Sequence, residues 1–355
     1  MVHALYPIWK CHHFRRTQPE LMQRARYVSS LIEYLFEQLT GEAAVSKCIA
    51  SGSGFLDIHT LDWHDELLEL VHLERDQFAE LKDGPHWAGL RASIAGELGL
   101  QPGIPVTVGF SDGAMNQVGI GGDEQGTMSF SVGTSGAIRT IASQPLIPET
   151  PSTWCYYLYN GKRLVGAATQ GAGDCVDWFA GNLPEGAGGY QALERAAEEI
   201  DVEQAPFFLP FIYGERSPGW QDQRLGGFLD VRPQHGVGDF YHALLEGILF
   251  NIYHCYTILS GLVGEPKEIL ISGGIMHSQL WLQMAADIFQ RVLLTTGVTD
   301  DSIIGMSVVA LQALVQLKEG EYKPRTAVAA NPQRGKRQAY QERFQRYLEL
   351  YELNR

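Results

Sequence analysis

The chain has 355 residues, of which 45% are hydrophobic and 19% charged, and its formal net charge at pH 7 is -14. This length is sufficient for about two domains, each with its own hydrophobic core. The acidic balance argues against a large nucleic-acid surface, which needs clustered Lys and Arg, and against anchoring on anionic lipid. A small anionic ligand is still possible, because a few local donors can bind one.

The N-terminal segment does not have the apolar core of a signal peptide, since Pro7, Lys10 and His12 interrupt it. No apolar run approaches the length that crosses a membrane. The five cysteines are scattered and form no C-x-x-C pair, which is typical of reduced thiols in the cytoplasm. Cys11, His12 and His13 are read as surface residues rather than a metal site, because no second pair of ligands follows them. We therefore expect a cytoplasmic protein that binds neither nucleic acid nor membrane.

The first third of the chain is expected to be mainly helical. The stretch TQPE, residues 17–20, combines a capping box with a proline near the first helical position. The apolar residues that follow keep helical spacing as far as Gly41, a natural C-cap. Two more helical stretches and one strand complete this part, at about 64–82, 86–98 and 104–110.

From about residue 127 the pattern becomes rich in strands, with four apolar or alternating segments before residue 170. We place a domain boundary near Gly126. The remaining elements are helices at about 190–199 and 238–260, a strand at 267–272, an amphipathic helix from Ser278, and a connection at 321–336 to a last helix. Tyr340, Phe344, Tyr347, Leu348 and Tyr351 form one stripe of that helix. Strands and helices mixed in this order predict an α/β chain.

Asp112 stands directly after the predicted strand 104–110, where α/β proteins commonly present residues that face a ligand. A carboxylate in this place can accept a proton from a hydroxyl while the hydroxyl oxygen attacks an electrophile. Asp followed by Gly is also a common turn pair, so an Asx turn is the alternative. For this dipeptide alone, a turn is the more common structure.

The loop GTSG, residues 133–136, interrupts an alternating apolar run. Its amides and the hydroxyls of Thr134 and Ser135 can surround phosphate oxygens, as backbone nests do. A hairpin turn explains the same residues, and both interpretations remain open on the local sequence.

Two more glycine-rich junctions each precede a predicted helix. The segment TQGAGDCVDW, residues 169–178, lets a phosphate or a flat ring approach the backbone, although helix-strand packing explains it nearly as well. In ILISGGIMHSQLW, Gly273 and Gly274 allow close approach of a nucleotide, and Ser278 can cap the helix or touch the ligand. A plain β-turn-α joint is the alternative. The sequence contains no Walker or Rossmann signature.

In this order the segments resemble the FGGY family of carbohydrate kinases, most closely its gluconate-kinase branch. GFSDGAMNQVGIG is similar to the family stretch with the catalytic aspartate, which implies that role for Asp112. SVGTSGAIRT is similar to the second phosphate loop, which implies that Gly133, Thr134 and Ser135 meet the nucleotide phosphates.

The resemblance extends over nearly the whole chain. GAGDCVDWF implies that Gly173 and Asp177 line the nucleotide, and SGGIMHSQLWLQMAADIF implies that Gly274 and Ser278 do so too. LPFIYGERSPGWQDQRLGGFLDV is close to a family run of the form G-E-R-x-P-x-W. HALYPIWK is similar to the H-x-x-x-P-x-x-K segment of the gluconate branch.

The resemblance implies an α/β, actin-like ATPase (ribonuclease H-like) fold with its second domain complete and its first domain truncated. We expect a remnant of the sugar-binding N-terminal domain, a nucleotide-binding C-terminal domain, and a linker with a last helix. Their bounds are 1–126, 127–320 and 321–355.

The chain departs from the family pattern at several points. Two phosphate loops close on the nucleotide in this fold, and the first carries Asp-x-Gly-Thr, which none of the 355 residues supplies. The family often has Gln where Asp177 stands, Leu225 splits its Arg-Gly pair, and Ser46-Lys47 replaces a segment that tends to include Asp. We expect apolar surface to be exposed where the rest of the first domain would pack.

The resemblance implies an ATP-dependent kinase acting on gluconate or a related sugar or sugar acid, with Mg²⁺ as cofactor and ATP or ADP as nucleotide. The absence of one phosphate loop is expected to impair activity. Two alternatives follow: a non-catalytic nucleotide-binding or interaction protein, or one half of a split kinase. Self-association, or a partner chain that supplies the other loop, is therefore expected.

Overall fold

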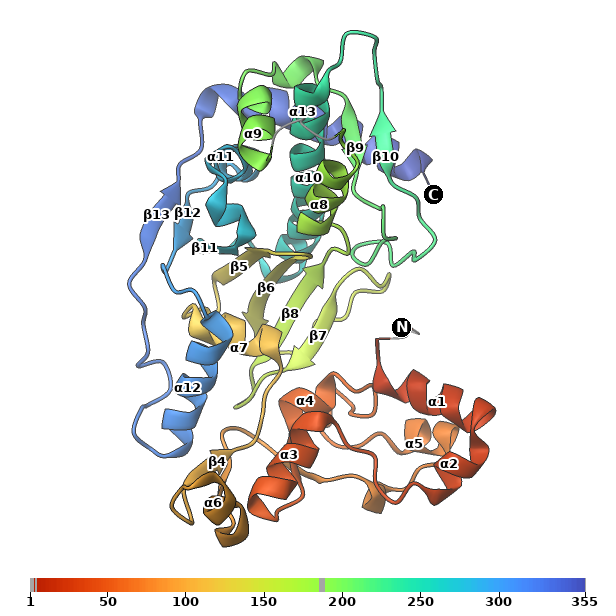
Figure 1. Cartoon of the computed structure of the whole chain (residues 1–355), viewed down its shortest axis with the longest axis vertical. Coiled ribbons are helices and arrows are strands. Elements are labelled where there is room, and N and C mark those ends of the chain that lie inside the picture. Colours follow the sequence, from red (N-terminus) through yellow and green to blue (C-terminus); the bar gives the residue numbers. More distant parts are fainter. Residues whose placement is uncertain (1–2, 4, 185–188, 355) are drawn as a thin grey trace.

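The computed structural model describes residue 3, residues 5–184 and residues 189–354. Two bodies of structure lie one above the other in Figure 1. We call residues 3–111, at the bottom of that view, the N-terminal part, and residues 112–354 the sheet part. Their elements differ greatly in size.

The N-terminal part consists of short helices and two small sheets. Strand β1 pairs in parallel with β2, and β3 pairs antiparallel with β4. The elements are α1 (Pro7–Thr17), α2 (Pro19–Arg24), α3 (Leu31–Thr40), β1 (Ala44–Ser46), α4 (Lys47–Ser51), α5 (Asp65–Val71), β2 (Glu80–Lys82), β3 (Trp87–Gly89), α6 (Ala92–Leu98) and β4 (Pro105–Thr107).

The predicted capping box at residues 17–20 is wrong, because α2 begins after Gln18 without a side-chain cap, although Pro19 is its first residue as predicted. The capping box lies at Ser30 instead. Its Oγ accepts from the Glu33 amide at 3.3 Å, and Glu33 Oε2 accepts from the Ser30 amide at 2.6 Å. The C-cap at Gly41 is confirmed, with a φ of +86° that favours glycine.

The two helices predicted at 64–82 and 86–98 are only partly confirmed. Helix α5 stops at Val71, and residues 80–82 form β2 beside β1. In the second stretch, residues 87–89 form β3 beside β4, and only 92–98 are helical. Pairing with a distant strand therefore overrides the local helical spacing. The strand predicted at 104–110 is present as the shorter β4.

The sheet part is organised around one seven-stranded sheet, whose order is β13-β12-β11-β5-β6-β8-β7. The neighbours β11 and β5 are parallel, as are β11 and β12, whereas β5, β6, β8 and β7 run antiparallel in turn. The strands are β5 (Thr127–Val132), β6 (Gly136–Ala142), β7 (Trp154–Tyr157), β8 (Arg163–Ala168), β11 (Glu268–Gly273), β12 (Leu293–Thr295) and β13 (Ala327–Ala330).

This strand-rich segment was predicted, but β13 was not. It lies inside the expected connection at 321–336 and adds an edge strand antiparallel to β12. A short strand at a sheet edge leaves little periodic signal, because only one neighbour constrains its side chains.

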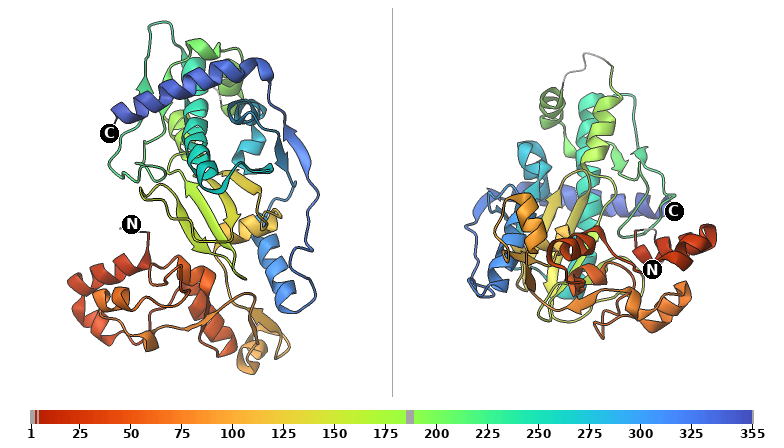
Figure 2. Two further views of the ribbon diagram at one scale, coloured as in Figure 1. Left: turned by 180° about the vertical axis from the view of Figure 1, so that it is seen from behind. Right: turned by 60° about the horizontal axis from the view of Figure 1, so that its bottom comes forward.

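Helices cover both faces of the sheet. Helix α10 crosses one face, and its Leu244, Ile248 and Phe250 are fully buried; α7 and α12 lie against the other face (Figures 1 and 2). No helix in the described part of the chain is both long and apolar enough to cross a bilayer. The remaining elements are α7 (Asp112–Gly119), α8 (Gly173–Gly181), α9 (Tyr190–Glu198), β9 (Phe207–Leu209), β10 (Gly227–Leu229), α10 (Val237–Val263), α11 (Gln279–Phe289), α12 (Asp301–Ala313), α13 (Arg337–Leu353), and 3-10 turns at Arg75–Gln77, Val202–Gln204, Gly274–His277 and Arg334–Lys336.

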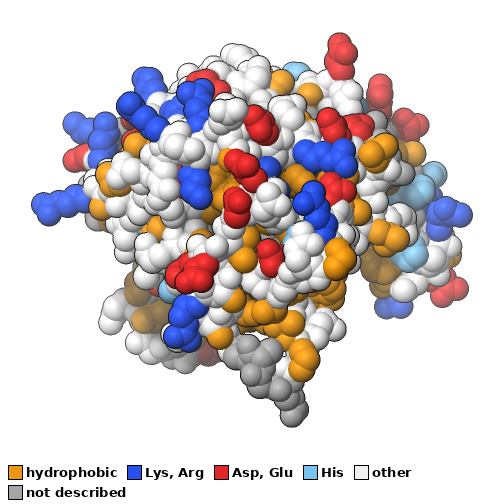
Figure 3. Space-filling view, turned by 90° about the horizontal axis from the view of Figure 1, so that it is seen from above, with side chains coloured by type: hydrophobic (Ala, Val, Ile, Leu, Met, Phe, Trp, Pro, Cys, Tyr) orange, Lys and Arg blue, Asp and Glu red, His pale blue; other side chains and the backbone are white. Residues whose placement is uncertain are grey.

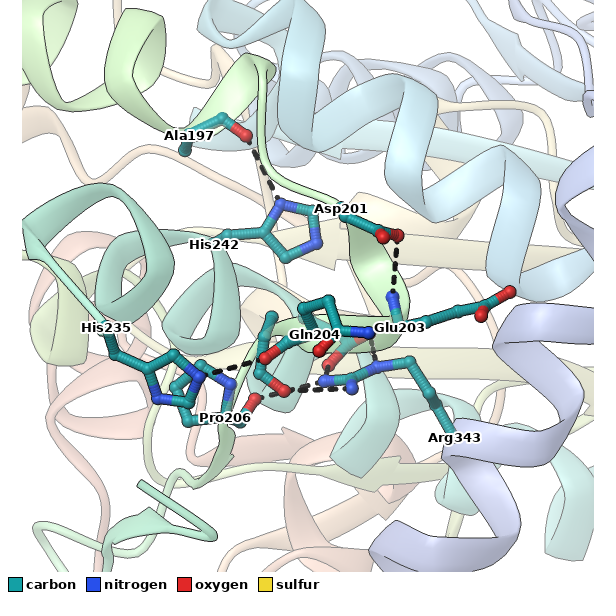
Figure 4. Close-up of polar contacts among 10 residues, drawn as sticks. Ala197, Asp201, Glu203, Gln204, Pro206, His235, His242 and Arg343 are labelled. Carbon is teal, nitrogen blue, oxygen red and sulfur yellow. Dashed lines mark hydrogen bonds and ion pairs between the residues drawn. The ribbon is translucent and has the colours of Figure 1, made fainter. Parts of the chain in front are cut away.

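The last helix, α13, packs across α10 through the predicted aromatic stripe. Tyr340, Phe344, Tyr347 and Tyr351 are all buried. Arg343 ties the same helix to the core, because its guanidinium pairs with buried Glu246 and donates to the carbonyls of Ala205 and Pro206 at 3.0 Å (Figure 4). The end of the molecule seen from above, in Figure 3, mixes basic and acidic side chains with apolar ones.

Candidate active site

Asp112 is the first residue of α7 and lies where the N-terminal part meets the sheet part. Its carbonyl accepts from Ser302 Oγ at 3.2 Å, so α12 fixes the start of α7. Its Oδ1 accepts from the Gly113 amide at 2.6 Å, and the side chain is exposed. The Asx-turn alternative is thus confirmed only in part, because Asp112 is the first residue of a helix and not part of an isolated turn.

Asp112 lines a cavity of about 480 Å³, which we call the acceptor cavity after the hydroxyl acceptor that the sequence predicts beside Asp112. Both parts of the molecule form its walls. The N-terminal part contributes side chains such as Ser30 and Cys48, and the sheet part contributes Trp154 and Arg216. Such a volume is in the range of small-ligand sites.

The loop of residues 133–135 is the tip of a hairpin between β5 and β6, since Val132 pairs with Gly136. The Gly133 amide donates to the Ser135 carbonyl at 2.9 Å, and all three residues are exposed. The hairpin interpretation is therefore confirmed. It does not compete with a ligand-binding role, because the exposed tip lines cavities on the surface.

A second cavity of about 450 Å³ adjoins the same loop, and we call it the nucleotide cavity after the ligand that the sequence predicts for this loop. It is lined by Gly133, Thr134, Gly273 and, from the start of α12, Asp300 and Asp301. Ser135, Ala137 and Arg139 line both cavities. Two adjoining cavities that share a loop suit the transfer of a group from one ligand to another.

Gly173, at the start of α8, packs against the loop of residues 133–135. Its amide donates to the Gly133 carbonyl at 2.9 Å, and the Asp174 amide donates to the Thr134 carbonyl at 3.2 Å. A Cβ at position 173 would lie 2.5 Å from the Gly133 oxygen, so close packing requires glycine here. This favours the packing interpretation of the 169–178 segment.

Asp177 is exposed on α8, and its Oδ1 accepts from the Tyr190 hydroxyl at 2.6 Å. It lines neither the acceptor cavity nor the nucleotide cavity. Its contact with a nucleotide stays a prediction.

The Gly273-Gly274 pair follows β11 beside the loop. Gly273 has a φ of +92°, and a Cβ there would lie 2.3 Å from the Val132 carbonyl oxygen, so it cannot be replaced without strain. A Cβ at Gly274 would lie 3.5 Å from the same oxygen, which leaves room. Ser278 caps α11, accepting from the Trp281 amide at 3.1 Å. Capping therefore occupies Ser278, and nucleotide contact by Gly274 or Ser278 stays a prediction.

Five charged residues of these cavities were not singled out from the sequence: Glu33, Arg139, Arg216, Asp300 and Asp301. Arg139 does carry a signal, because it is the one charge within the apolar strand GAIRTIA. Asp301 Oδ1 is buried without a hydrogen-bond partner among the described residues, and burial raises the pKa of this carboxyl.

Comparison with known proteins gives two family matches. Residues 1–119 match the N-terminal domain, and residues 128–314 the C-terminal domain, of the FGGY family of carbohydrate kinases. The gluconokinase of Bacillus subtilis is 27% identical over 324 residues, which cover 88% of this chain and 63% of that protein. The xylulose kinase of Escherichia coli is 31% identical over 278 residues, covering 77% of this chain and 57% of that protein.

A solved structure agrees with these matches. The gluconate kinase of Lactobacillus acidophilus superimposes with a TM-score of 0.95 and 26% identity, covering 99% of this chain and 72% of that one. The predicted α/β kinase fold is thereby confirmed. This chain spans less than two thirds of the length of the two curated relatives.

Proposed function

The chain belongs to the FGGY family of carbohydrate kinases, and on that premise we propose that it transfers the γ-phosphoryl group of ATP to a hydroxyl of gluconate or a related sugar or sugar acid. The observation that carries the proposal is the pair of cavities joined at the loop 133–135, with Asp112 in one and Gly273 in the other. The resemblance to gluconate kinases at the N-terminal HALYPIWK segment favours a sugar acid over a ketose.

In the proposed reaction, the acceptor hydroxyl lies in the acceptor cavity beside Asp112. As its oxygen bonds to the γ-phosphorus, the Asp112 carboxylate takes the proton and the bond from the γ-phosphorus to the β-phosphate oxygen breaks, which releases ADP. The amides and hydroxyls of Thr134 and Ser135 donate to the phosphate oxygens, while the Gly133 amide holds the loop through the Ser135 carbonyl. Phosphoryl transfer depends almost wholly on such positioning and charge stabilisation.

The residues present fit a Mg²⁺ ion at the nucleotide cavity. Mg²⁺ prefers oxygen ligands and is commonly held by one or two carboxylates together with phosphates and water. Asp300 and Asp301 line the nucleotide cavity, and Asp301 Oδ1 is free of hydrogen bonds to the described residues. When bound, the ion would neutralise phosphate charge; the side chains of Asp300 and Asp301 are the candidates to hold it.

One observation favours an alternative, a non-catalytic nucleotide-binding protein or half of a split kinase. The 355 residues contain no Asp-x-Gly-Thr segment, and loss of a single preorganised donor set typically costs about a hundred- to a thousand-fold in rate. We therefore expect the 355-residue polypeptide alone to phosphorylate gluconate negligibly. A fragment that carries an Asp-x-Gly-Thr loop should restore turnover when added.

The test couples ADP release to the addition of gluconate, for the polypeptide alone and with that fragment. Asp112→Asn should abolish the restored turnover while leaving ADP affinity nearly unchanged, because it removes the base and not the phosphate loop. Asp76→Asn, at an exposed position that lines neither cavity, is the control. Robust turnover by the polypeptide alone would overturn the expected impairment, and unchanged turnover in Asp112→Asn would overturn the assigned base.

Nucleotide binding is tested separately by calorimetry with ATP and ADP. We expect weak binding, which Gly274→Asp should abolish by placing a carboxylate where the nucleotide approaches. Gly274→Ala is the matched control, since position 274 has room for a Cβ. No binding at millimolar nucleotide would contradict the proposed function, and retained binding in Gly274→Asp would contradict the assignment of that glycine.

A further inference from the structure

We propose that Arg139 binds the phosphoryl group as it passes from the nucleotide cavity to the acceptor cavity, and that its guanidinium stabilises the charge of that group in the transition state. The proposal rests on the proposed kinase function. It assigns a catalytic role to a residue that none of the sequence assignments includes.

The position of Arg139 in the sheet is the first support. It lies on β6 three residues after Gly136, opposite Ser129 of β5 and Gly166 of β8. Side chains alternate along a strand, so Arg139 shares a face with Ile141. Ile141 is buried in the apolar cluster beneath α7 and α12. A long cationic side chain on this face is unusual and lies at the point where the two cavities adjoin.

The contacts of Arg139 are the second support. Its Nη1 donates to Ser131 Oγ at 3.1 Å, and it has no other hydrogen bond or ion pair among the described residues. A guanidinium has five donor hydrogens, so most of its capacity is left for a ligand. A Cβ added at Gly113 would lie 3.3 Å from Nε, which places the guanidinium beside the start of α7 and next to Asp112.

The electrostatic setting agrees with an anion site. Burial lowers the pKa of Arg139 to about 10, the Asp112 carboxylate opposes that shift, and the nearby Arg216 adds to it. The side chain remains a cation at neutral pH. A half-buried cation without a paired carboxylate is costly unless an anion joins it. The phosphoryl group supplies that anion only while it lies between the cavities.

The chemistry explains why an arginine suits this place. In a loose transition state, charge is spread over the three equatorial oxygens of the phosphoryl group while the acceptor oxygen and the departing ADP oxygen lie in line. A planar guanidinium can donate to two of those oxygens at once. The proton still goes to Asp112 and the electron pair of the broken bond stays on ADP, so Arg139 neither gains nor loses a proton.

Calorimetry on the full 355-residue chain tests the proposal without requiring turnover. The probes are ADP alone and ADP with aluminium fluoride, a mimic of the transferring phosphoryl group, both with Mg²⁺. Arg139→Met should weaken binding of the aluminium fluoride complex by about a hundred-fold or more, the size of effect expected for one transition-state donor. Its affinity for ADP alone should stay within about two-fold, which also shows that the variant is folded.

Two further variants sharpen the test. Arg139→Lys should recover only part of the loss, because an ammonium cannot form the planar pair of bonds. Arg195→Met, at an exposed position on α9, should bind both probes as the unchanged chain does. Equal weakening of ADP and of the aluminium fluoride complex would overturn the proposal in favour of a structural role.

Another result would also overturn it. If Arg139→Met bound the aluminium fluoride complex normally but lost affinity for gluconate and not for a neutral polyol, Arg139 would bind the acceptor's carboxylate. Failure of the unchanged chain to bind ADP at all would instead overturn the kinase proposal and this inference with it. ADP binding by the unchanged chain thus separates the two failures.

Discussion

The N-terminal part and the sheet part differ in how well each supports itself. The sheet part has seven paired strands, a fully buried stretch of α10 and an ion pair that anchors α13. The N-terminal part has two sheets of two strands each, and α3 exposes 71% of Leu31 and 48% of Leu35. Sheets of two strands need other elements to stabilise them. Apolar side chains are thus exposed on α3, and packing of the rest of the first domain against this helix stays a prediction.

This difference divides the candidate site. Asp112, the loop 133–135 and Gly273 all belong to the sheet part, whereas Ser30, Cys48 and other walls of the acceptor cavity belong to the N-terminal part. Nucleotide binding should therefore depend on the better supported region, and acceptor binding on the less supported one. Variants that disturb one part alone test whether the two parts differ in this way.

The largest effect is expected from Arg343→Ala in the sheet part. It leaves Glu246, whose side chain is fully buried, without its cationic partner. Removing one partner of a buried pair typically costs about 3–5 kcal/mol. Urea unfolding followed by circular dichroism measures the loss. Arg346→Ala, on the same helix but in exposed pairs with Asp230 and Glu349, should cost less than about 1 kcal/mol. Equal losses in the two variants would mean that α13 does not anchor the sheet part.

An intermediate effect concerns pH and His254 of α10. Burial, with a smaller contribution from Arg224, lowers the pKa of this histidine to about 4. Its Nδ1 is buried without a partner among the described residues. Because the unfolded chain, with a histidine pKa near 6.5, binds the proton more readily, stability present above pH 6.5 is lost as the pH falls toward 4. We expect a loss of about 2 kcal/mol between pH 7.5 and pH 5 from this group.

His254→Gln should remove that share of the pH dependence, which free energies of unfolding at the two pH values measure. His59→Asn, at an exposed position in the N-terminal part, is the control and should keep the original dependence. If His254→Gln and the unchanged chain lost stability equally on acidification, the sheet part would have no acid-sensitive core at this position.

The smallest effect on stability, and the clearest on association, is expected in the N-terminal part. Leu31→Ser with Leu35→Ser should change the free energy of unfolding by less than about 1 kcal/mol, because both side chains are already largely exposed. The same change should reduce self-association, which light scattering after size-exclusion chromatography measures. Leu353→Ser, 79% exposed at the end of α13, is a control for exposed leucines elsewhere. If the unsubstituted chain is already monomeric, α3 is not an association surface.

Much of the fold and part of the site followed from the sequence, because local chemistry determines them. The strands of 127–170, helix α10 and the stripe of α13 have uninterrupted periodicity, and Gly41 and Ser278 cap helices as their residue types favour. The position of Asp112 after a strand and the hairpin at 133–136 were also predictable. Long ordered motifs indicated the family, which the comparisons confirm.

Tertiary structure alone decided the rest. Residues 80–82 and 327–330 became strands only because distant partners lay beside them, and their own sequences carry little strand signal. Arg139 and Asp301 are 162 positions apart, the difference between their numbers, and they line one cavity because β6 and the start of α12 meet at the loop. Spacing along a sequence describes one element at a time. Which charged side chains share a cavity depends on how elements pack, and that information lies in contacts between distant residues.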